Sequence, residues 1–257
     1  TRVRSSAASD VYKRQVFYAL PSAKTIARWK QETPATFRIC PKVSRSISHT
    51  GNLETGKRET FQLIERMSGL GSRLGPMFLQ LPPAFGPAHL AQLEAFLDFW
   101  PSEVRLAVEV RHPDFYKEQQ AFLLDSLLSQ HQVARVMMDT RPIRMGPDKE
   151  QRVLQARERK PNLPVHIVTT TDFIFLRYIG NPHMEVNEPF FKEWAEQLAR
   201  WHNEGITLYV FCHCPFEVHS PNICKTLYQR VSAHVSLPPL PWEREDTDAE
   251  AQQPRLF

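Results

Sequence analysis

The 257-residue chain is 42% hydrophobic and 11% aromatic, which suffices for one domain with a sizeable core, and it has no apolar run of about 18 residues that would cross a membrane. Its formal charge of +4 is concentrated at the start, because residues 1–15 supply +3 through Arg2, Arg4, Lys13 and Arg14 against Asp10. The rest of the chain is close to neutral, so we expect a soluble protein that does not bind nucleic acid directly.

Residues 1–15, TRVRSSAASDVYKRQ, are interpreted as a non-native leader. They lack the long apolar core of a secretory signal, and SSAASDVYKRQ resembles translated adapter sequence. The next residues, VFYAL, are typical of the end of a strand. We therefore predict that the native domain covers residues 16–236, starts inside its second strand, and leaves the edges of the second and last strands unpaired.

Apolar residues recur at helical spacing in most stretches between the predicted strands. A short helix begins after Pro21 and ends before Pro34. Further amphipathic helices are predicted around residues 61–67, 90–100, 124–131, 190–201 and 223–231. Residues 148–160 indicate a charged and more exposed helix. The aromatic residues on these helices favour core packing over a cofactor site.

Six short apolar runs alternate with the helices, and each ends on a polar or charged residue: FRICPK, PMFLQLPP, LAVEVRH, ARVMMD, FIFLRYIG and LYVFCHC. Strands that alternate with helices form a parallel sheet. With VFYAL the count is seven strands, one fewer than a closed eight-stranded barrel requires. The predicted fold is α/β: a TIM-type (β/α) barrel that is incomplete because its first strand and helix are missing.

The polar residues that end the strands form the candidate site, because the carboxyl ends of parallel strands share one crevice or barrel mouth. Alternate residues of a strand point to opposite faces. One face can therefore hold Lys42, Gln80, Glu109, Asp139, Arg177 and His213. The other face is then apolar, with Ile39, Leu79, Val108, Val110, Met138, Ile174, Leu176, Val210 and Cys212.

This set of residues is suited to acid–base chemistry. Glu109 and Asp139, on consecutive strands, can divide the roles of acid and base. Lys42 and Arg177 can bind a substrate carboxylate or phosphate, or keep the two carboxylates ionised. A buried structural network is the alternative. A Schiff base on Lys42 is disfavoured, because its neighbours look too polar to lower its pKa by desolvation.

Metal and cofactor sites receive little support from the sequence. No Walker loop, GxGxxG after a strand, HExxH or GxSxG motif occurs. A divalent ion between Glu109, Asp139 and His213 stays an alternative. Cys212 and Cys214 flank His213 and project to the other face, so they cannot easily complete a zinc site. We predict no metal, identify no cofactor, and expect the four cysteines to be reduced in the cytoplasm.

Several ordered motifs resemble the YecE family (domain of unknown function 72): VFYALPSAKTIARWKQETPATFRICPKVSRSISH, GPMFLQLPPAFGP, VEVRHPDFY, MDTRP, FLRYIGN and the terminal LF. The resemblance runs from about Val16 to the C-terminus. It implies an incomplete TIM-type barrel and places these residues on recurrent family positions: Lys42, His49, Gln80, Pro82, Glu109, Arg111, His112, Asp139 and Arg177. His213 departs from the family pattern. The family name assigns no activity.

The resulting hypotheses belong to three classes. The first is an enzyme for a small polar or anionic substrate, with Glu109, Asp139, Lys42 and His213 in catalysis and Arg111, Arg177, Gln80, His49 and His112 in binding. The second is a non-catalytic module that binds a ligand at the same mouth. The third is partner docking through the Pro-rich, acidic tail 237–257, which we expect to be disordered. In this tail Gln253, Leu256 and Phe257 resemble the peptide that docks on the bacterial DNA sliding clamp.

Overall fold

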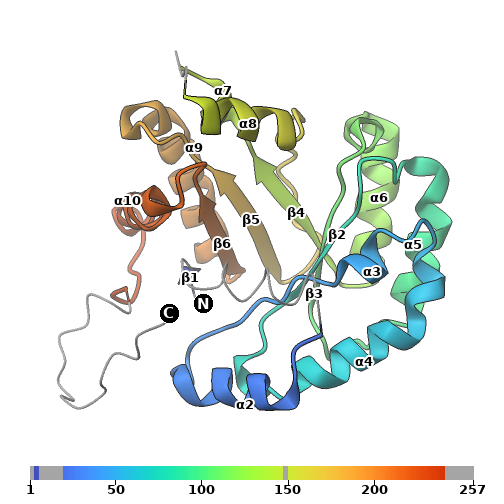
Figure 1. Ribbon diagram of the computed structural model, residues 1–257. Helices are drawn as coiled ribbons and strands as arrows, with labels where there is room; N and C mark the ends of the chain where they lie inside the picture. The colour runs from blue at the N-terminus through green and yellow to red at the C-terminus, as the bar shows by residue number, and fades with distance from the viewer. Residues whose placement is uncertain (1–2, 6–19, 147–149, 241–257) are drawn as a thin grey trace.

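A computed structural model describes residues 3–5, 20–146 and 150–240 of the chain. Its centre is a curled parallel sheet with the strand order β1-β6-β5-β4-β3-β2 (Figure 1). The strands are β1 (Val3–Ser5), β2 (Met77–Gln80), β3 (Leu106–Glu109), β4 (Ala134–Asp139), β5 (Phe173–Ile179) and β6 (Thr207–His213). The predicted α/β class is confirmed, and β2 to β6 form a half-barrel.

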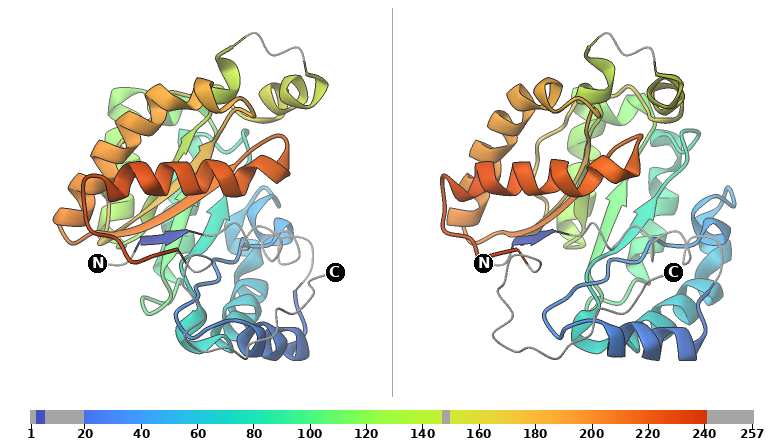
Figure 2. Two further views of the ribbon diagram at one scale, coloured as in Figure 1. Left: turned by 90° about the vertical axis from the view of Figure 1, so that its left-hand side faces the viewer. Right: turned by 60° about the vertical axis from the view of Figure 1, so that its left-hand side comes forward.

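Helices connect successive strands and cover the outer face of the sheet. The α-helices are α2 (Ala23–Glu32), α3 (Arg45–Ser48), α4 (Lys57–Ser68), α5 (Leu90–Asp98), α6 (Glu118–Gln130), α7 (Arg141–Arg144), α8 (Gln151–Arg159), α9 (Met184–Asn203) and α10 (Ser220–Ser232). Short 3-10 helices are η1 (Leu53–Gly56), η2 (Gly71–Arg73), η3 (Pro87–His89), η4 (Pro113–Tyr116) and η5 (Glu217–His219). In Figures 1 and 2, α9 and α10 pack beside β5 and β6, whereas α4 and α5 lie on the side of β2 and β3. None of the helices described here has the length and apolarity of a membrane span.

The predicted strand FRICPK is extended but does not form a regular strand. It makes only isolated parallel bridges, from Ile39 to Leu74 and from Lys42 to Phe78. Pro41 has no backbone N–H to donate, although its carbonyl accepts from the Phe78 N–H at 2.8 Å. The segment therefore follows the edge of β2 and still carries Lys42 to the end of the sheet.

The other edge of the sheet differs from the prediction. β1 pairs in parallel with β6, with Val3 opposite Leu208 and Ser5 opposite Val210. The expectation that the edge of the last strand is unpaired is therefore wrong for these positions, because residues of the proposed leader occupy it. The foreign origin of the leader stays a prediction.

The alternation of the strands separates two kinds of core. The inner, concave face is aromatic and small, with Cys40, Phe78, Ala107, Ala134, Val136, Phe173, Phe175, Tyr209 and Phe211. Leu79, Val108 and Met77 pack outward under α2, α4, α5 and α6, and Leu176, Tyr178 and Val210 pack under α9 and α10. The predicted orientation is confirmed for the outward Leu79, Val108, Leu176 and Val210.

The prediction is wrong for β4. Met138 pairs with Arg177 of the inner face, and Asp139 pairs with Tyr178 of the outer face. Asp139 therefore points outward and Met138 inward, one residue out of step with the expectation. In ARVMMD both faces carry an apolar residue near the end, so alternation alone did not fix the orientation. Arg135 shares the outer face with Asp139 and is also buried.

The packed domain extends past its predicted end at residue 236. Leu240 is buried, and the Tyr228 hydroxyl donates a hydrogen bond to the Pro238 carbonyl. Leu237, which is partly buried, and Leu240 of the proposed tail therefore contribute to packing, whereas Pro238 and Pro239 are exposed. The sliding-clamp prediction on Gln253, Leu256 and Phe257 lies outside the described residues and stays a prediction.

Candidate functional site

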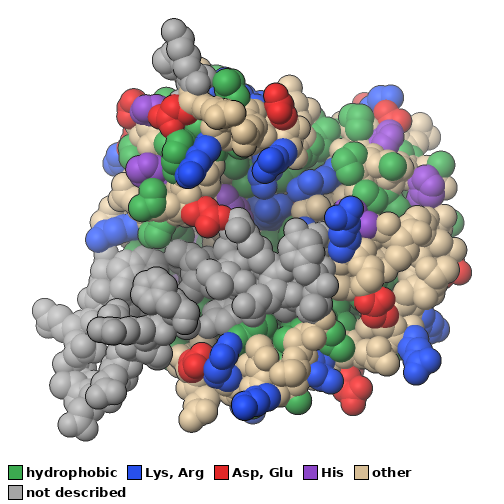
Figure 3. Space-filling model, in the orientation of Figure 1, with side chains coloured by type: hydrophobic (Ala, Val, Ile, Leu, Met, Phe, Trp, Pro, Cys, Tyr) green, Lys and Arg blue, Asp and Glu red, His purple; other side chains and the backbone are tan. Residues whose placement is uncertain are grey.

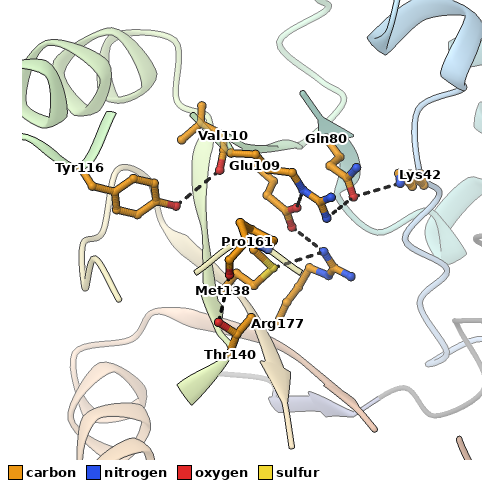
Figure 4. A network of polar contacts seen from close by, with 10 residues as sticks. Lys42, Gln80, Glu109, Val110, Tyr116, Met138, Thr140, Pro161 and Arg177 are labelled. Atoms are coloured by element: carbon orange, nitrogen blue, oxygen red, sulfur yellow. Dashed lines mark hydrogen bonds and ion pairs between the residues drawn. The ribbon is translucent and has the colours of Figure 1, made fainter. Parts of the chain in front are cut away.

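Strand ends bring four of the predicted site residues together on the inner face. Gln80 and Glu109 are the last residues of β2 and β3 and pair with each other in the sheet. Arg177 lies near the end of β5, and Lys42 lies on the extended segment beside β2. With Arg111 they form a connected set, called the mouth network below (Figure 4).

Glu109 is the centre of this network. Its Oε1 accepts a hydrogen bond from Arg111 Nε at 2.8 Å, and its Oε2 accepts one from Arg177 Nη1 at 2.5 Å. Gln80 Oε1 accepts from both Arg111 Nη2 at 2.9 Å and Lys42 Nζ at 3.1 Å. The chain of contacts from Lys42 through Gln80, Arg111 and Glu109 to Arg177 is therefore continuous, and Figure 4 labels Lys42, Gln80, Glu109 and Arg177.

The environment of Glu109 keeps it ionised. Burial alone would raise the pKa of this carboxyl, which is only 1% exposed, but the charges and hydrogen bonds of Arg177 and Arg111 lower the pKa to about 2. A carboxylate of such low pKa is a poor proton donor or acceptor near neutral pH. Its geometric effect is to hold two guanidinium groups in fixed positions.

Lys42 differs from Glu109 in that its environment disfavours the charged form of the side chain. Burial lowers its pKa first, the positive charge of Arg177 lowers it further, and Glu109 offsets only part of this, so that the pKa falls from 10.5 to about 7. The expectation that the neighbours of Lys42 are too polar for desolvation to lower its pKa is wrong, because burial is the largest cause of the shift and the positive charge of Arg177 adds to it. Near neutral pH a large share of the Lys42 amine is unprotonated.

A cavity of about 760 Å³ opens over the mouth network. Its lining residues are Lys42, Phe78, Gln80, Arg152, Gln155, Ala156, Arg159, Lys160, Arg177, Ile179, His213, Cys214, Pro215, Phe216, Glu217, Val218 and Ser220. Five of these residues are cationic, and Glu217 is the one carboxylate among them. Figure 3 shows Lys and Arg side chains gathered at the hollow in this face. The mouth cavity is therefore suited to an anionic ligand.

The predicted histidines occupy different places. His213, at the end of β6, lines the mouth cavity. Burial lowers the pKa of His49, and the nearby positive charge of Lys42 lowers it further. Its Nδ1 lies 2.7 Å from Ser48 Oγ. His112 Nδ1 accepts the Asp114 N–H at the start of η4, and the ring lines a separate cavity of about 460 Å³. His112 is thus outside the mouth cavity.

Asp139 does not join Glu109. Its oxygens accept hydrogen bonds from Trp194 Nε1 at 2.8 Å and from Arg141 Nε at 3.0 Å and Nη2 at 2.8 Å. These bonds tie the end of β4 to α7 and α9 on the outer face. The pairing of Glu109 and Asp139 as acid and base is therefore contradicted by the geometry. The same holds for a divalent ion shared by Glu109, Asp139 and His213, and no group of three or more His, Cys, Asp or Glu residues in the described ranges could hold a metal ion.

Sequence reasoning missed the cations of α8 and the loop after β6. Arg152, Arg159 and Lys160 line the mouth cavity, as do Phe216 and Glu217. The available signal was the excess of Arg and Lys in QRVLQARERK, where Val153 is the one buried position of the helix. That excess predicted an exposed helix correctly, but the sequence did not place it over the strand ends.

Comparisons with known proteins agree with this fold. The profile of the family described as "Protein of unknown function DUF72" matches residues 14–245. The chain is 37% identical over 213 residues to "UPF0759 protein YecE" of Escherichia coli strain K12, covering 82% of this chain and 78% of that protein. A solved DUF72 family protein from Enterococcus faecalis V583 superposes with a TM-score of 0.66 at 16% identity, covering 92% of this chain and 98% of that one. A second, from Thermotoga maritima MSB8, gives a TM-score of 0.59 at 19% identity, over 84% and 82% of the two chains.

Proposed function

Since the chain belongs to the DUF72 family, whose description assigns no activity, we propose from the geometry of the mouth that it is an enzyme for acid–base chemistry on a small anionic substrate, with Lys42 as the base. The observation that carries the proposal is the position of Lys42: a half-buried amine in a cation-lined cavity of about 760 Å³. Its pKa of about 7 suits a group that must exchange protons near neutral pH.

Each member of the mouth network has a defined role in this proposal. Arg177 binds the anionic group of the substrate, since its Nη1 is held by Glu109 while its buried Nε has no hydrogen-bond partner among the described residues. Glu109 positions Arg177 and Arg111 and does not transfer a proton. Gln80 orients Lys42 through the 3.1 Å hydrogen bond.

The proton then moves from the substrate to Lys42. A C–H or O–H bond next to the bound anion loses its proton to the unprotonated Nζ, and the electron pair stays on the substrate. The positive charges of Arg177 and Arg111 stabilise the negative charge that develops there. The fixed guanidinium groups need no rearrangement during this step, because Glu109 already holds them.

Imine formation at Lys42 is a second candidate, because the same burial that lowers its pKa also makes the amine a nucleophile. In that reaction the amine attacks a substrate carbonyl and water leaves. It needs the same anion site and the same unprotonated Lys42, so it differs from the first candidate only in the covalent bond.

The proposal also includes the complete fold and the cellular location of the protein. We take the curled sheet to be part of a TIM-type barrel, whose sites lie at the carboxyl ends of the strands. We also propose a cytoplasmic location, for which the four free and buried cysteines, Cys40, Cys212, Cys214 and Cys224, are the support.

The test is hydrogen exchange on small anionic C–H acids. Dihydroxyacetone phosphate, pyruvate and phosphoglycolate are incubated with the protein in D₂O, and deuterium incorporation is followed by NMR. The expected result is catalysed exchange on at least one compound, reduced about 100-fold or more in Lys42→Met. Borohydride added to the same mixtures traps an imine as a mass increase on Lys42. Exchange at the parent rate in Lys42→Met, or no exchange on any compound, would contradict the proposal.

A further inference from the structure

A second group of cations lines the mouth cavity, apart from the mouth network. Arg152 and Arg159 are exposed residues of α8, and Lys160 follows the helix directly. The positive charge of Lys160 contributes to the lowered pKa of Lys42, so the two groups share one electrostatic environment. The cavity thus has a cationic floor at Arg177 and Lys42 and a cationic wall on α8.

The wall arginines differ from two paired arginines on the surface of the fold, Arg141 and Arg230. Arg141 pairs with Glu193 at 2.9 Å, and Arg230 pairs with Glu188 at 2.8 Å. Neither Arg152 nor Arg159 pairs with a carboxylate of the described residues. Arg152 instead lies over the ring of Phe216, 5.2 Å from its centroid. This cation–π contact, and not an ion pair, orients the guanidinium group.

Hydrogen bonds hold the backbone of α8 in place, so the cationic side chains start from fixed positions. Arg144 Nη2 donates to the carbonyls of Arg157 at 3.0 Å and of Lys160 at 2.7 Å. In return, Arg157 Nε donates to the Ile143 carbonyl at 2.5 Å. These bonds anchor the end of α8 to α7, and buried Val153 anchors its start. These bonds hold α8 in place although the positive charges of Arg144 and Arg157 repel each other.

The cavity is larger than one oxyanion requires. About 760 Å³ lies within the range of about 300–1,000 Å³ that is usual for ligands of several carbon atoms. A phosphate or carboxylate on the floor therefore leaves room for a spacer and a second group that reaches α8. Phe216 and Ile179 also line the cavity and contribute apolar side chains to it.

We propose that the mouth cavity binds a ligand with two anionic groups, one on the Arg177 floor and one on Arg152 and Arg159 of α8. The floor subsite rests on the proposed function, whereas the α8 subsite is additional to it. The ligand class is a short carbon chain with a phosphate at one end and a carboxylate or second phosphate at the other. Guanidinium groups suit both because they can donate two parallel hydrogen bonds to one oxyanion.

Two probes of nearly equal size test the second subsite. 3-Phosphoglycerate carries a phosphate and a carboxylate, whereas glycerol 3-phosphate has a hydroxymethyl group in place of the carboxylate. Calorimetric titration at pH 7 and fixed ionic strength gives a Kd for each. We expect the parent protein to bind 3-phosphoglycerate at least about tenfold more tightly, a difference typical of one charge-assisted contact.

Substitution of the wall then separates the subsites. In Arg152→Gln with Arg159→Gln the preference for 3-phosphoglycerate should fall to less than about threefold, while the Kd of glycerol 3-phosphate changes little. The control is Arg58→Gln with Arg200→Gln, which removes the same charge from exposed helix positions away from the cavity. The control should keep the full preference.

The outcomes distinguish the two proposals. If glycerol 3-phosphate and 3-phosphoglycerate bind the parent equally, or if the control loses the preference as fully as the wall variant does, the α8 subsite is wrong and the floor stands. If neither compound binds the parent, both the α8 subsite and the anion-binding floor are wrong. Thermal unfolding of each variant, expected within a few degrees of the parent, shows that the wall substitutions act on binding and not on folding.

Discussion

Two of the buried ionic networks among the described residues differ in how their charges are matched. One is the mouth network around Glu109. The other, called the Arg135 network, joins Arg135 of β4 to Asp125 of α6 and, through Asp125, to His166. Both contain a carboxylate whose pKa would be raised by burial but is lowered by its partners.

The Arg135 network is a closed network, in which the buried guanidinium and the carboxylate balance each other. Arg135 Nη1 donates to Asp125 Oδ1 at 2.7 Å, and its Nη2 donates to the Phe115 carbonyl at 2.8 Å. The guanidinium lies over the ring of Tyr116, and His166 Nε2 lies 2.7 Å from the other Asp125 oxygen. One buried guanidinium therefore meets one carboxylate, and the network fastens α6 to the sheet.

The mouth network is an open network by comparison, in which positive charges outnumber negative charges. One carboxylate, Glu109, serves the two guanidinium groups of Arg111 and Arg177, and Lys42 adds a third cation beside them. The surplus of positive charge faces a cavity instead of a packed helix. Burial of charge alone does not mark a site. An imbalance that borders a cavity is the feature that favours a ligand.

The largest expected effect tests the closed network. Asp125→Asn should lower the free energy of unfolding by about 3 kcal/mol, because it leaves the buried Arg135 without its charged partner. Urea unfolding measures the loss. The affinity for inorganic phosphate should not change. A loss below about 1 kcal/mol would mean that the Arg135 network is not structural.

The matched substitution in the open network is Glu109→Gln. Its expected loss is smaller, about 2 kcal/mol, because Arg177 borders the mouth cavity, from which water or an anion can take the place of the carboxylate. Inorganic phosphate should bind more tightly than to the parent, by about threefold or more at low salt, and should recover part of the lost stability. Phosphate that stabilised the Asp125→Asn and Glu109→Gln variants equally would remove the distinction between the networks.

A smaller effect of opposite sign is expected for Lys42→Met. The pKa of Lys42 is about 7 in the folded protein and 10.5 as the ordinary value, so between these pH values the unfolded chain binds more protons and folding releases them. Lys42 therefore reduces stability most at and below pH 7, and this penalty disappears as the pH rises toward 10.5. Lys42→Met should be more stable than the parent by about 1 kcal/mol at pH 7, with the gain lost by about pH 10. A constant difference across this range would show that Lys42 titrates normally.

Alternation and strand ends were sufficient to predict most of the mouth network. Glu109 and Gln80 end their strands, Arg177 lies near the end of β5, and the opposite faces are apolar, so a parallel sheet brings the three residues together. Asp139 is the exception, because β4 carries Arg135 and Asp139 on its outer face, where contacts with α6 and α9 satisfy them.

Two other features could not be derived from the pattern. The position of α8 over the strand ends depends on contacts distant in sequence, such as the Arg144 bonds to the end of the helix. The lowered pKa of Lys42 depends first on its burial and then on the cations around it, and alternation along the strands predicts neither. The resemblance to family motifs identified Lys42 as a position of interest but gave no reason for its chemistry.

The most direct test of the account is the pKa of Lys42 in the folded protein. Reductive methylation at graded pH, with the Lys42 peptide quantified by mass spectrometry, gives the fraction of unprotonated amine, and the urea-unfolded chain serves as the reference. The account predicts an apparent pKa of about 7 in the folded protein, rising when phosphate is added because a bound anion favours the charged amine. A folded-state pKa equal to that of the unfolded chain, unchanged by phosphate, would contradict the account.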